Sequence, residues 1–192
     1  MRQQHAGDVW KGMAVGFAGG LAGSLVMNGV HSLTEKISQT RKEQESPQHS
    51  AHRGKEEGAA QESGDDATVR AADRISQGLF GHPLNKRKKK WAGPAVHYAM
   101  GGLTGALYGA AAELVPGVTR GAGLPFGTAV WLGADEVAVP ALGLAEPPLQ
   151  HPPSVHARAL AAHLVYGLTT EGVRRLLRGV RSPAPARSGD GR

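Results

Sequence analysis

Apolar runs alternate with one strongly polar insert along the chain. Four apolar segments stand out, over residues 12–30, 92–115, 121–145 and 155–173. The first has no charged residue in 19 positions. At a helical rise of about 1.5 Å per residue it reaches roughly 28 Å, which matches a hydrocarbon core of about 30 Å. Because the backbone finds no water in lipid, such segments should be helices, and the pattern predicts a membrane protein.

The polar insert occupies residues 31–90 and carries 12 of the 22 basic and 9 of the 16 acidic residues. Residues 38–65 are rich in Gln, Ser, Glu and His, which is the composition of a disordered linker. Residues 66–80 differ, because apolar side chains recur there near helical spacing behind Asp66, a residue suited to capping. We expect a short amphipathic helix there, lying at the membrane surface.

A run of cations stands directly before the second apolar segment and ends at Trp91. It consists of Lys86, Arg87, Lys88, Lys89 and Lys90. Near an anionic surface each cation is worth on the order of 1 kcal/mol, so we expect this run to bind anionic lipid headgroups. Nucleic acid is the poorer interpretation of the partner, since no aromatic platform or known binding motif accompanies the run.

Glycines recur every four residues in the apolar segments. They are Gly12, Gly16 and Gly20 in the first segment and Gly101, Gly105 and Gly109 in the second. In water each would weaken a helix by about 1 kcal/mol, whereas in lipid small residues let two helix backbones approach closely. The spacing therefore predicts glycine-mediated helix packing, within one chain or between copies in a homo-oligomer.

The predicted fold is all-α, an integral membrane bundle of four apolar helices with a long, largely disordered polar loop. The third segment either crosses the membrane or is re-entrant, because four full spans would put the two basic clusters, before the second segment and after the fourth, on opposite faces. The expected division is a transmembrane helix over residues 1–30, the loop over 31–90, a membrane helical domain over 91–178 and a disordered tail over 179–192.

Composition narrows the chemistry. The net charge of +6 suits an anionic partner, and the absence of Cys excludes disulfides, thiolate metal sites and a cysteine nucleophile. No His-x-x-x-His or Glu-x-x-His pair falls on one helix face, so we predict no metal site and no cofactor. No set of catalytic residues is indicated, and we expect a protein that is not an enzyme.

Ionisable residues inside the apolar segments are the functional candidates, because each costs about 2.5–3.5 kcal/mol or more at the bilayer centre. They are Asp135, Glu136, His163, His97, Glu113 and Glu171. His163 paired with Asp135 or Glu136 would form a protonatable site. Asp135 and Glu136 lie about 100° apart on an α-helix, so both cannot face one partner.

The remaining candidates lie near segment ends. His97 and Glu113 are about 24 Å apart along one helix and cannot form a single site within it. Glu171 precedes Arg174 and Arg175 by three and four residues, which is typical of an interfacial salt bridge.

A short motif also recurs. Tyr108-Gly109-x-x-x-Glu113 is echoed by Tyr166-Gly167-x-x-x-Glu171, near the ends of the second and fourth segments. Related elements of this kind occur in transporters built from repeats.

Several further features stand at specific spacings. They are His97, Ala106-Leu107-Tyr108-Gly109, Ala112-Glu113-Leu114-Val115-Pro116, a Gly-rich third segment ending in Pro140-Ala141-Leu142-Gly143-Leu144 with Pro147-Pro148, His163-Leu164-Val165-Tyr166, Glu171 and Arg174-Arg175. On these features residues 97–175 resemble the YagU family of bacterial inner-membrane proteins, a domain of unknown function. The resemblance implies an α-helical protein of the inner membrane and brings no substrate or catalytic residue.

Two functions remain open from the sequence. The first is a small proton-linked conduit or transporter that uses Asp135, Glu136 and His163. The second is a structural envelope protein that assembles through its glycines and holds anionic lipid.

Overall fold

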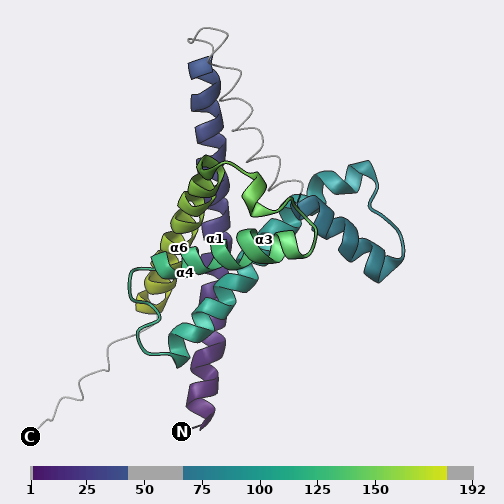
Figure 1. Cartoon of the computed structure of the whole chain (residues 1–192). Coiled ribbons are helices and arrows are strands. Elements are labelled where there is room, and N and C mark those ends of the chain that lie inside the picture. The colour runs from purple at the N-terminus through teal and green to yellow at the C-terminus, as the bar shows by residue number, and fades with distance from the viewer. Residues whose placement is uncertain (1, 43–66, 181–192) are drawn as a thin grey trace, which may run out of the picture.

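The computed structural model describes residues 2–42 and 67–180, and every regular element in those ranges is a helix. The predicted all-helical fold is thus confirmed for the described residues. The elements are α1 (Arg2–Lys42), a helix over residues 67–80, α3 (Lys86–Leu114), α4 (Leu124–Val130), the π-helix η1 (Trp131–Ala138), α5 (Val139–Ala141), the 3-10 turn η2 (Pro148–Gln150) and α6 (Pro153–Val180). Figure 1 shows α3 and α6 crossing the long α1.

α1 is longer than the sequence predicts. It has 41 residues and extends through residues 31–42, which were expected to belong to the loop. That expectation was wrong because no Gly or Pro interrupts the helix after Gly29. Polar side chains on its surface form hydrogen bonds with the helix backbone. The hydroxyls of Ser32 and Thr40 each donate, over 3.0 Å, to the carbonyl oxygen four residues earlier. The rest of the predicted linker, residues 43–66, and the tail from residue 181 lie outside the described residues.

α1 is the one described helix that is both long and apolar enough to cross a membrane. Its residues Asp8–Leu33 have a mean hydropathy of 1.4. Four such helices are not found in the described residues. α3 and α6 are long enough, with 29 and 28 residues, but their many Gly, His and Tyr residues and the cations at their ends lower their hydropathy.

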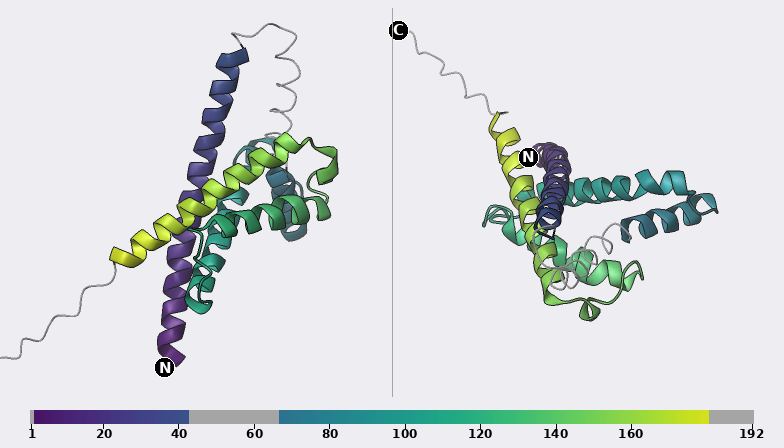
Figure 2. Two further views of the ribbon diagram at one scale, coloured as in Figure 1. Left: turned by 60° about the vertical axis from the view of Figure 1, so that its left-hand side comes forward. Right: turned by 90° about the horizontal axis from the view of Figure 1, so that it is seen from above.

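The third apolar segment is a bent, composite helix rather than a straight span. It begins after a turn that ends at Gly123, whose φ of 88° only glycine adopts readily. It ends in a Schellman motif at Gly143, whose N–H donates to the Pro140 carbonyl while that of Leu144 donates to the Val139 carbonyl. In Figure 1 and in the left view of Figure 2 this segment runs across α1, not along it.

The helix over residues 67–80 is present where the sequence predicts a short amphipathic helix. It pairs with the start of α3, because Asp73 accepts from the Leu84 N–H over 2.7 Å and from Lys89 Nζ over 2.8 Å. The Lys89 contact, followed by the Leu84 N–H, holds the pKa of Asp73 below its usual value. The guanidinium of Arg74 binds the carbonyl oxygens of Leu142 and Gly143, so this helix also covers the end of the third segment.

Packing in α3 is inverted relative to a soluble helix. The side that faces its neighbours buries Gly102, Gly105 and Gly109, whereas the outer side leaves Leu103 and Leu107 57% and 67% exposed. A soluble helix places its large apolar side chains inward. The helix contacts of α3 are thus made mostly by small residues beside the buried Tyr108, with bulky aliphatic side chains outside, a pattern typical of helices in lipid.

Candidate functional site

Two rows of glycines bring α1 and α3 into backbone contact. Gly12, Gly16 and Gly20 of α1 lie against Gly109, Gly105 and Gly101 of α3, respectively. A Cβ atom added to Gly12 would lie 2.6 Å from the Gly109 carbonyl oxygen, and the other five positions are as crowded. The residues singled out for packing therefore face one another within a single chain.

The same principle joins α6 to its neighbours. On another face of α1, a Cβ atom at Gly19 would lie 2.7 Å from the Thr170 carbonyl oxygen. In the third segment, Gly123 and Gly127 approach the α6 backbone at Gly167 and His163 too closely to admit a side chain. Glycine contacts thus hold α1, α3, α4 and α6 together and fix where the polar side chains of each helix meet.

A cavity of about 450 Å³ opens where α1, α3, η1 and α6 converge. Its lining includes five histidines, which are His31, His97, His151, His156 and His163. It also includes three carboxylates, which are Asp135, Glu136 and Glu146. Four of the six ionisable candidates from the sequence therefore line one cavity, and they come from three different helices.

Two carboxylate–imidazole pairs lie in this cavity. Glu136 Oε1 lies 2.7 Å from His156 Nδ1, and His156 Nε2 lies 3.0 Å from the Pro148 carbonyl oxygen. Asp135 Oδ2 lies 3.6 Å from His163 Nδ1, which also contacts the Ala159 carbonyl oxygen over 2.9 Å. The Glu136–His156 pair is close enough to share a proton, whereas Asp135 and His163 are within ion-pair distance without a hydrogen bond between them.

The π-helix explains how neighbouring carboxylates reach one cavity. In η1 the backbone bonds run from residue i to i+5, which widens the turn relative to an α-helix. Asp135 and Glu136 both line the cavity, yet each has its own histidine, on α6. This agrees with the expectation that the two cannot share one partner.

Sequence reasoning missed His156 as a site residue. It precedes His163 by seven residues, or two turns, so both project from one face of α6. The seven-residue spacing could have identified His156 from the sequence. Two histidines that each pair with a different carboxylate can lie two turns apart, whereas two ligands of one metal ion would need to lie three or four residues apart. His31, His151 and Glu146 carry no comparable signal, since only the folded arrangement brings them to the cavity.

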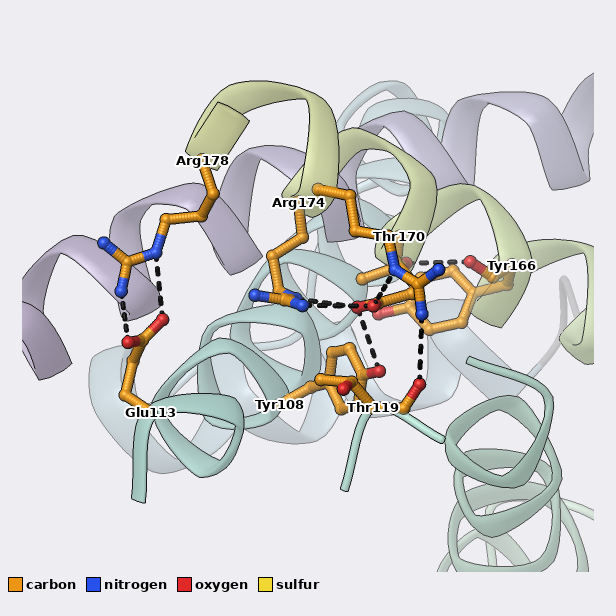
Figure 3. Close-up of polar contacts among 9 residues, drawn as sticks. Tyr108, Glu113, Thr119, Tyr166, Thr170, Arg174 and Arg178 are labelled. Carbon is orange, nitrogen blue, oxygen red and sulfur yellow. Dashed lines mark hydrogen bonds and ion pairs between the residues drawn. The ribbon is translucent and has the colours of Figure 1, made fainter. Parts of the chain in front are cut away.

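Glu171 does not line this cavity and pairs instead with two arginines of α6; Figure 3 shows its partners Tyr108 and Arg174. Its carboxylate is 1% exposed and accepts from Tyr108 Oη over 3.0 Å, Arg174 Nε over 2.7 Å and Arg175 Nε over 2.5 Å. A carboxylate bound by two guanidinium groups stays ionised. Glu171 is therefore a structural tie between α3 and α6, in keeping with the salt bridge expected from its spacing.

Glu113 is likewise part of a tie and not of the cavity. Arg178 Nε donates to Glu113 Oε1 over 2.9 Å, which links the end of α3 to the end of α6 (Figure 3). Among the candidates that the sequence offered for a proton site, Glu113 and Glu171 are thus separated by the structure from the other four.

Both copies of the Tyr-Gly-x-x-x-Glu motif make contacts between helices. Tyr108 of α3 donates to Glu171 of α6, and Tyr166 of α6 donates to the Gly101 carbonyl of α3 over 2.7 Å. Gly109 and Gly167 each meet another helix backbone, and both motif glutamates pair with arginines of α6. Each copy of the motif therefore lies at a helix crossing, Gly109 against α1 and Gly167 against α4.

The basic run forms the first turns of α3. The Asn85 side chain caps this helix by accepting from the Lys88 N–H over 2.9 Å. Lys86, Arg87, Lys88 and Lys90 are exposed, whereas Lys89 is half-buried against Asp73. The first turn contains no acidic residue, so these cations stand at the positive end of the helix dipole.

Within residues 2–42 and 67–180, no three His, Asp or Glu side chains are grouped so that they could hold a metal ion. Two of the cavity histidines, His156 and His163, each lie beside a single carboxylate instead.

Residues 80–172 match the model of a family described as "Protein of unknown function (DUF1440)". The matched stretch contains α3, the third segment and most of α6, and so both carboxylate–imidazole pairs. No curated protein and no solved structure matches the chain. Over residues 80–172 the chain is therefore similar to this uncharacterised family.

Proposed function

We propose that this protein is a small proton-linked conduit or transporter of a bacterial inner membrane, and not an enzyme. The observation that carries the proposal is the pair of carboxylate–imidazole contacts, Asp135 with His163 and Glu136 with His156, lining one cavity among the helices. Ionisable residues placed among apolar helices mark ion and proton pathways in membrane proteins.

A multi-pass membrane setting is supported by the packing. α1 carries an apolar stretch of 26 residues, and large apolar side chains project from the outer faces of α1, α3 and α6, including Leu25, Leu107 and Leu168. An exposed apolar surface over several helices would favour aggregation in water but is stable in lipid. The third segment, running across α1, fits the re-entrant alternative. We also propose that the matched family is the YagU family that residues 97–175 resemble.

The two pairs offer distinct steps for a proton. His156 faces two acceptors, the Glu136 carboxylate and the Pro148 carbonyl, so the ring is held in place whether the proton sits on the ring or on the carboxyl group. His163 and Asp135 are farther apart, and a small movement of either side chain would make or break their contact. A proton entering the cavity can thus bind first at one pair and then at the other.

The test is decay of an imposed pH gradient in liposomes that carry the purified protein. The double variant Asp135→Asn, Glu136→Gln removes both carboxylates with little change in size. We expect its decay to be at least about tenfold slower than that of the native protein, since general proton-transfer groups contribute about 10²-fold or more. Asp8→Asn, an exposed carboxylate of α1 outside the cavity, is the matched control and should behave as the native protein. Equal decay in the double variant would overturn the proposal.

A second function is favoured by the start of α3. Several exposed cations at the positive end of a helix, with no acidic residue in the first turn, leave room for an external anion. In this alternative the protein is an envelope scaffold that assembles through its glycines and holds anionic lipid. Replacing Lys86, Lys88 and Lys90 with Gln should then release the protein from anionic vesicles, while Asp135→Asn and Glu136→Gln should change only stability.

A further inference from the structure

A second cavity, of about 470 Å³, adjoins the polar one. The two share part of their lining, including His97, Asp135 and His163, so these side chains stand at the boundary between them. Each volume lies within the range of about 300–1,000 Å³ that is usual for sites of small ligands. Together they form a chamber with two compartments of different character.

The two compartments differ in polarity and charge. The second is lined mainly by apolar side chains such as Ile75, Met100 and Leu144. Among the described residues its lining contains one Lys or Arg side chain, Arg74, whose guanidinium is bound to the carbonyl oxygens of Leu142 and Gly143. An apolar group can enter this compartment without displacing a charged side chain.

The polar compartment is lined by carboxylates and imidazoles and, in the described chain, by no Lys or Arg side chain. Its fixed charge is therefore negative when the histidines are neutral, and protons on the histidines make it less so. An anion would meet like charge there, whereas a cation would meet Asp135, Glu136 and Glu146.

We propose that this chamber binds a lipophilic organic cation, with the charged centre beside Asp135 and Glu136 and the apolar groups in the second compartment. The exchange balances in charge. A cation that arrives beside a carboxylate replaces the proton held by that carboxylate and its histidine, and the proton leaves to water. The coupling to protons rests on the proposed function, whereas the binding itself does not.

The test uses tetraphenylphosphonium as the cation and tetraphenylborate as an anion of the same shape. Binding of each to the purified full-length protein in detergent is measured by equilibrium dialysis, with protein-free detergent as the blank. We expect saturable binding of the cation only. Its binding should be weaker at about pH 5 than at about pH 8, because at the lower pH protons on the histidines and carboxylates of the cavity oppose a bound cation. Saturable binding of the anion with equal affinity would overturn the inference.

Substitutions in each compartment test where the charged centre and the apolar groups of the cation bind. Asp135→Asn with Glu136→Gln should weaken cation binding by about tenfold or more, the effect of losing a charged contact. Ala71→Phe, which fills the apolar compartment and leaves the carboxylates in place, should also lose binding. Asp8→Asn should bind as the native protein does. Unchanged binding in both cavity variants would overturn the inference, and size-exclusion profiles show whether each variant is folded.

The outcome is separable from that of the proposed function. Gradient decay without any probe tests the proton pathway alone. Decay that depends on Asp135 and Glu136, without saturable binding of tetraphenylphosphonium, would overturn this inference and leave the conduit. Binding that depends on both residues, without gradient decay, would overturn the conduit and leave a cation site.

Discussion

At the scale of single residues, Glu171 is the buried charged side chain that ties α6 to Tyr108 of α3. Glu171→Gln should destabilise the protein by about 3 kcal/mol, because Arg174 then loses the ionic partner that compensates its burial. Thermal unfolding in detergent measures the loss. Tyr108→Phe is the matched control and should cost about 1 kcal/mol, since it removes one hydrogen bond to the same carboxylate. A Glu171→Gln protein as stable as the native one would contradict this account.

Asp73 gives a second prediction at this scale, for pH. Its pKa in the folded protein lies below its ordinary value because Lys89 and the Leu84 N–H bind the carboxylate. A lowered folded pKa means that the contact contributes stability above the unfolded pKa and loses it as pH falls through the folded pKa. Hydrogen exchange of residues 67–80 should therefore accelerate in acid, from about pH 5 to about pH 2.5, more than that of α1.

The control for Asp73 is Asp73→Asn, in which exchange over residues 67–80 should be faster already at about pH 5 and change less with acid. The same acid response in native protein and variant would show that another carboxylate controls this helix.

Residue types and their setting were enough to single out part of the site. Asp135, Glu136, His163 and His97 attract attention because ionisable groups in apolar segments are costly. Their meeting in one cavity could not be predicted, because it depends on how far each helix is rotated when it crosses α1. His31, by contrast, lies at the end of an apolar segment, where a histidine costs little and carries no signal.

At the scale of helices, the glycines of α1 offer a matched test. Gly16→Ala should destabilise the protein, because its Cβ atom would strike the α3 backbone at Gly105 and Gly109. Gly29→Ala has open space around its Cβ position and should instead be neutral or stabilise α1 by up to about 1 kcal/mol. Thermal unfolding of the two variants side by side measures both effects. Equal effects of the two substitutions would mean that helix propensity, and not close approach, decides the outcome.

Helix positions were more predictable from the sequence than helix shapes. The spacing of small residues predicted close packing, and apolar periodicity predicted a helix near residues 66–80. The π-helix was not predictable, because no residue pattern within Trp131–Ala138 distinguishes a π-helix from an α-helix. The full length of α1 does not follow from hydropathy, because residues 31–42 are polar yet contain no Gly or Pro to end the helix.

At the scale of the whole molecule, the exposed apolar side chains contact either lipid or water, and the two settings predict different effects of a charged substitution. Leu107 is 67% exposed on α3, and Leu149 is 99% exposed on η2. If the helices lie in lipid, Leu107→Lys should cost about 2.5 kcal/mol or more and lower the yield in the membrane fraction. Leu149→Lys, outside the long helices, should be nearly neutral. In water both changes would fall within about 0.5 kcal/mol of the native protein, and that result would contradict the membrane setting.

The glycine contacts of α1 have a consequence for biosynthesis. Gly19 leaves the ribosome long before Thr170, the residue of α6 on which it rests. At about 5–20 residues per second, the delay between the two is about 8–30 s. During that time the newly made α1 presents a face shaped to fit another helix backbone, with its final neighbour not yet synthesised. We expect nascent α1 helices to be kept from pairing with one another, by the insertion machinery or by slow diffusion, until α3 and α6 are synthesised and pack against that face.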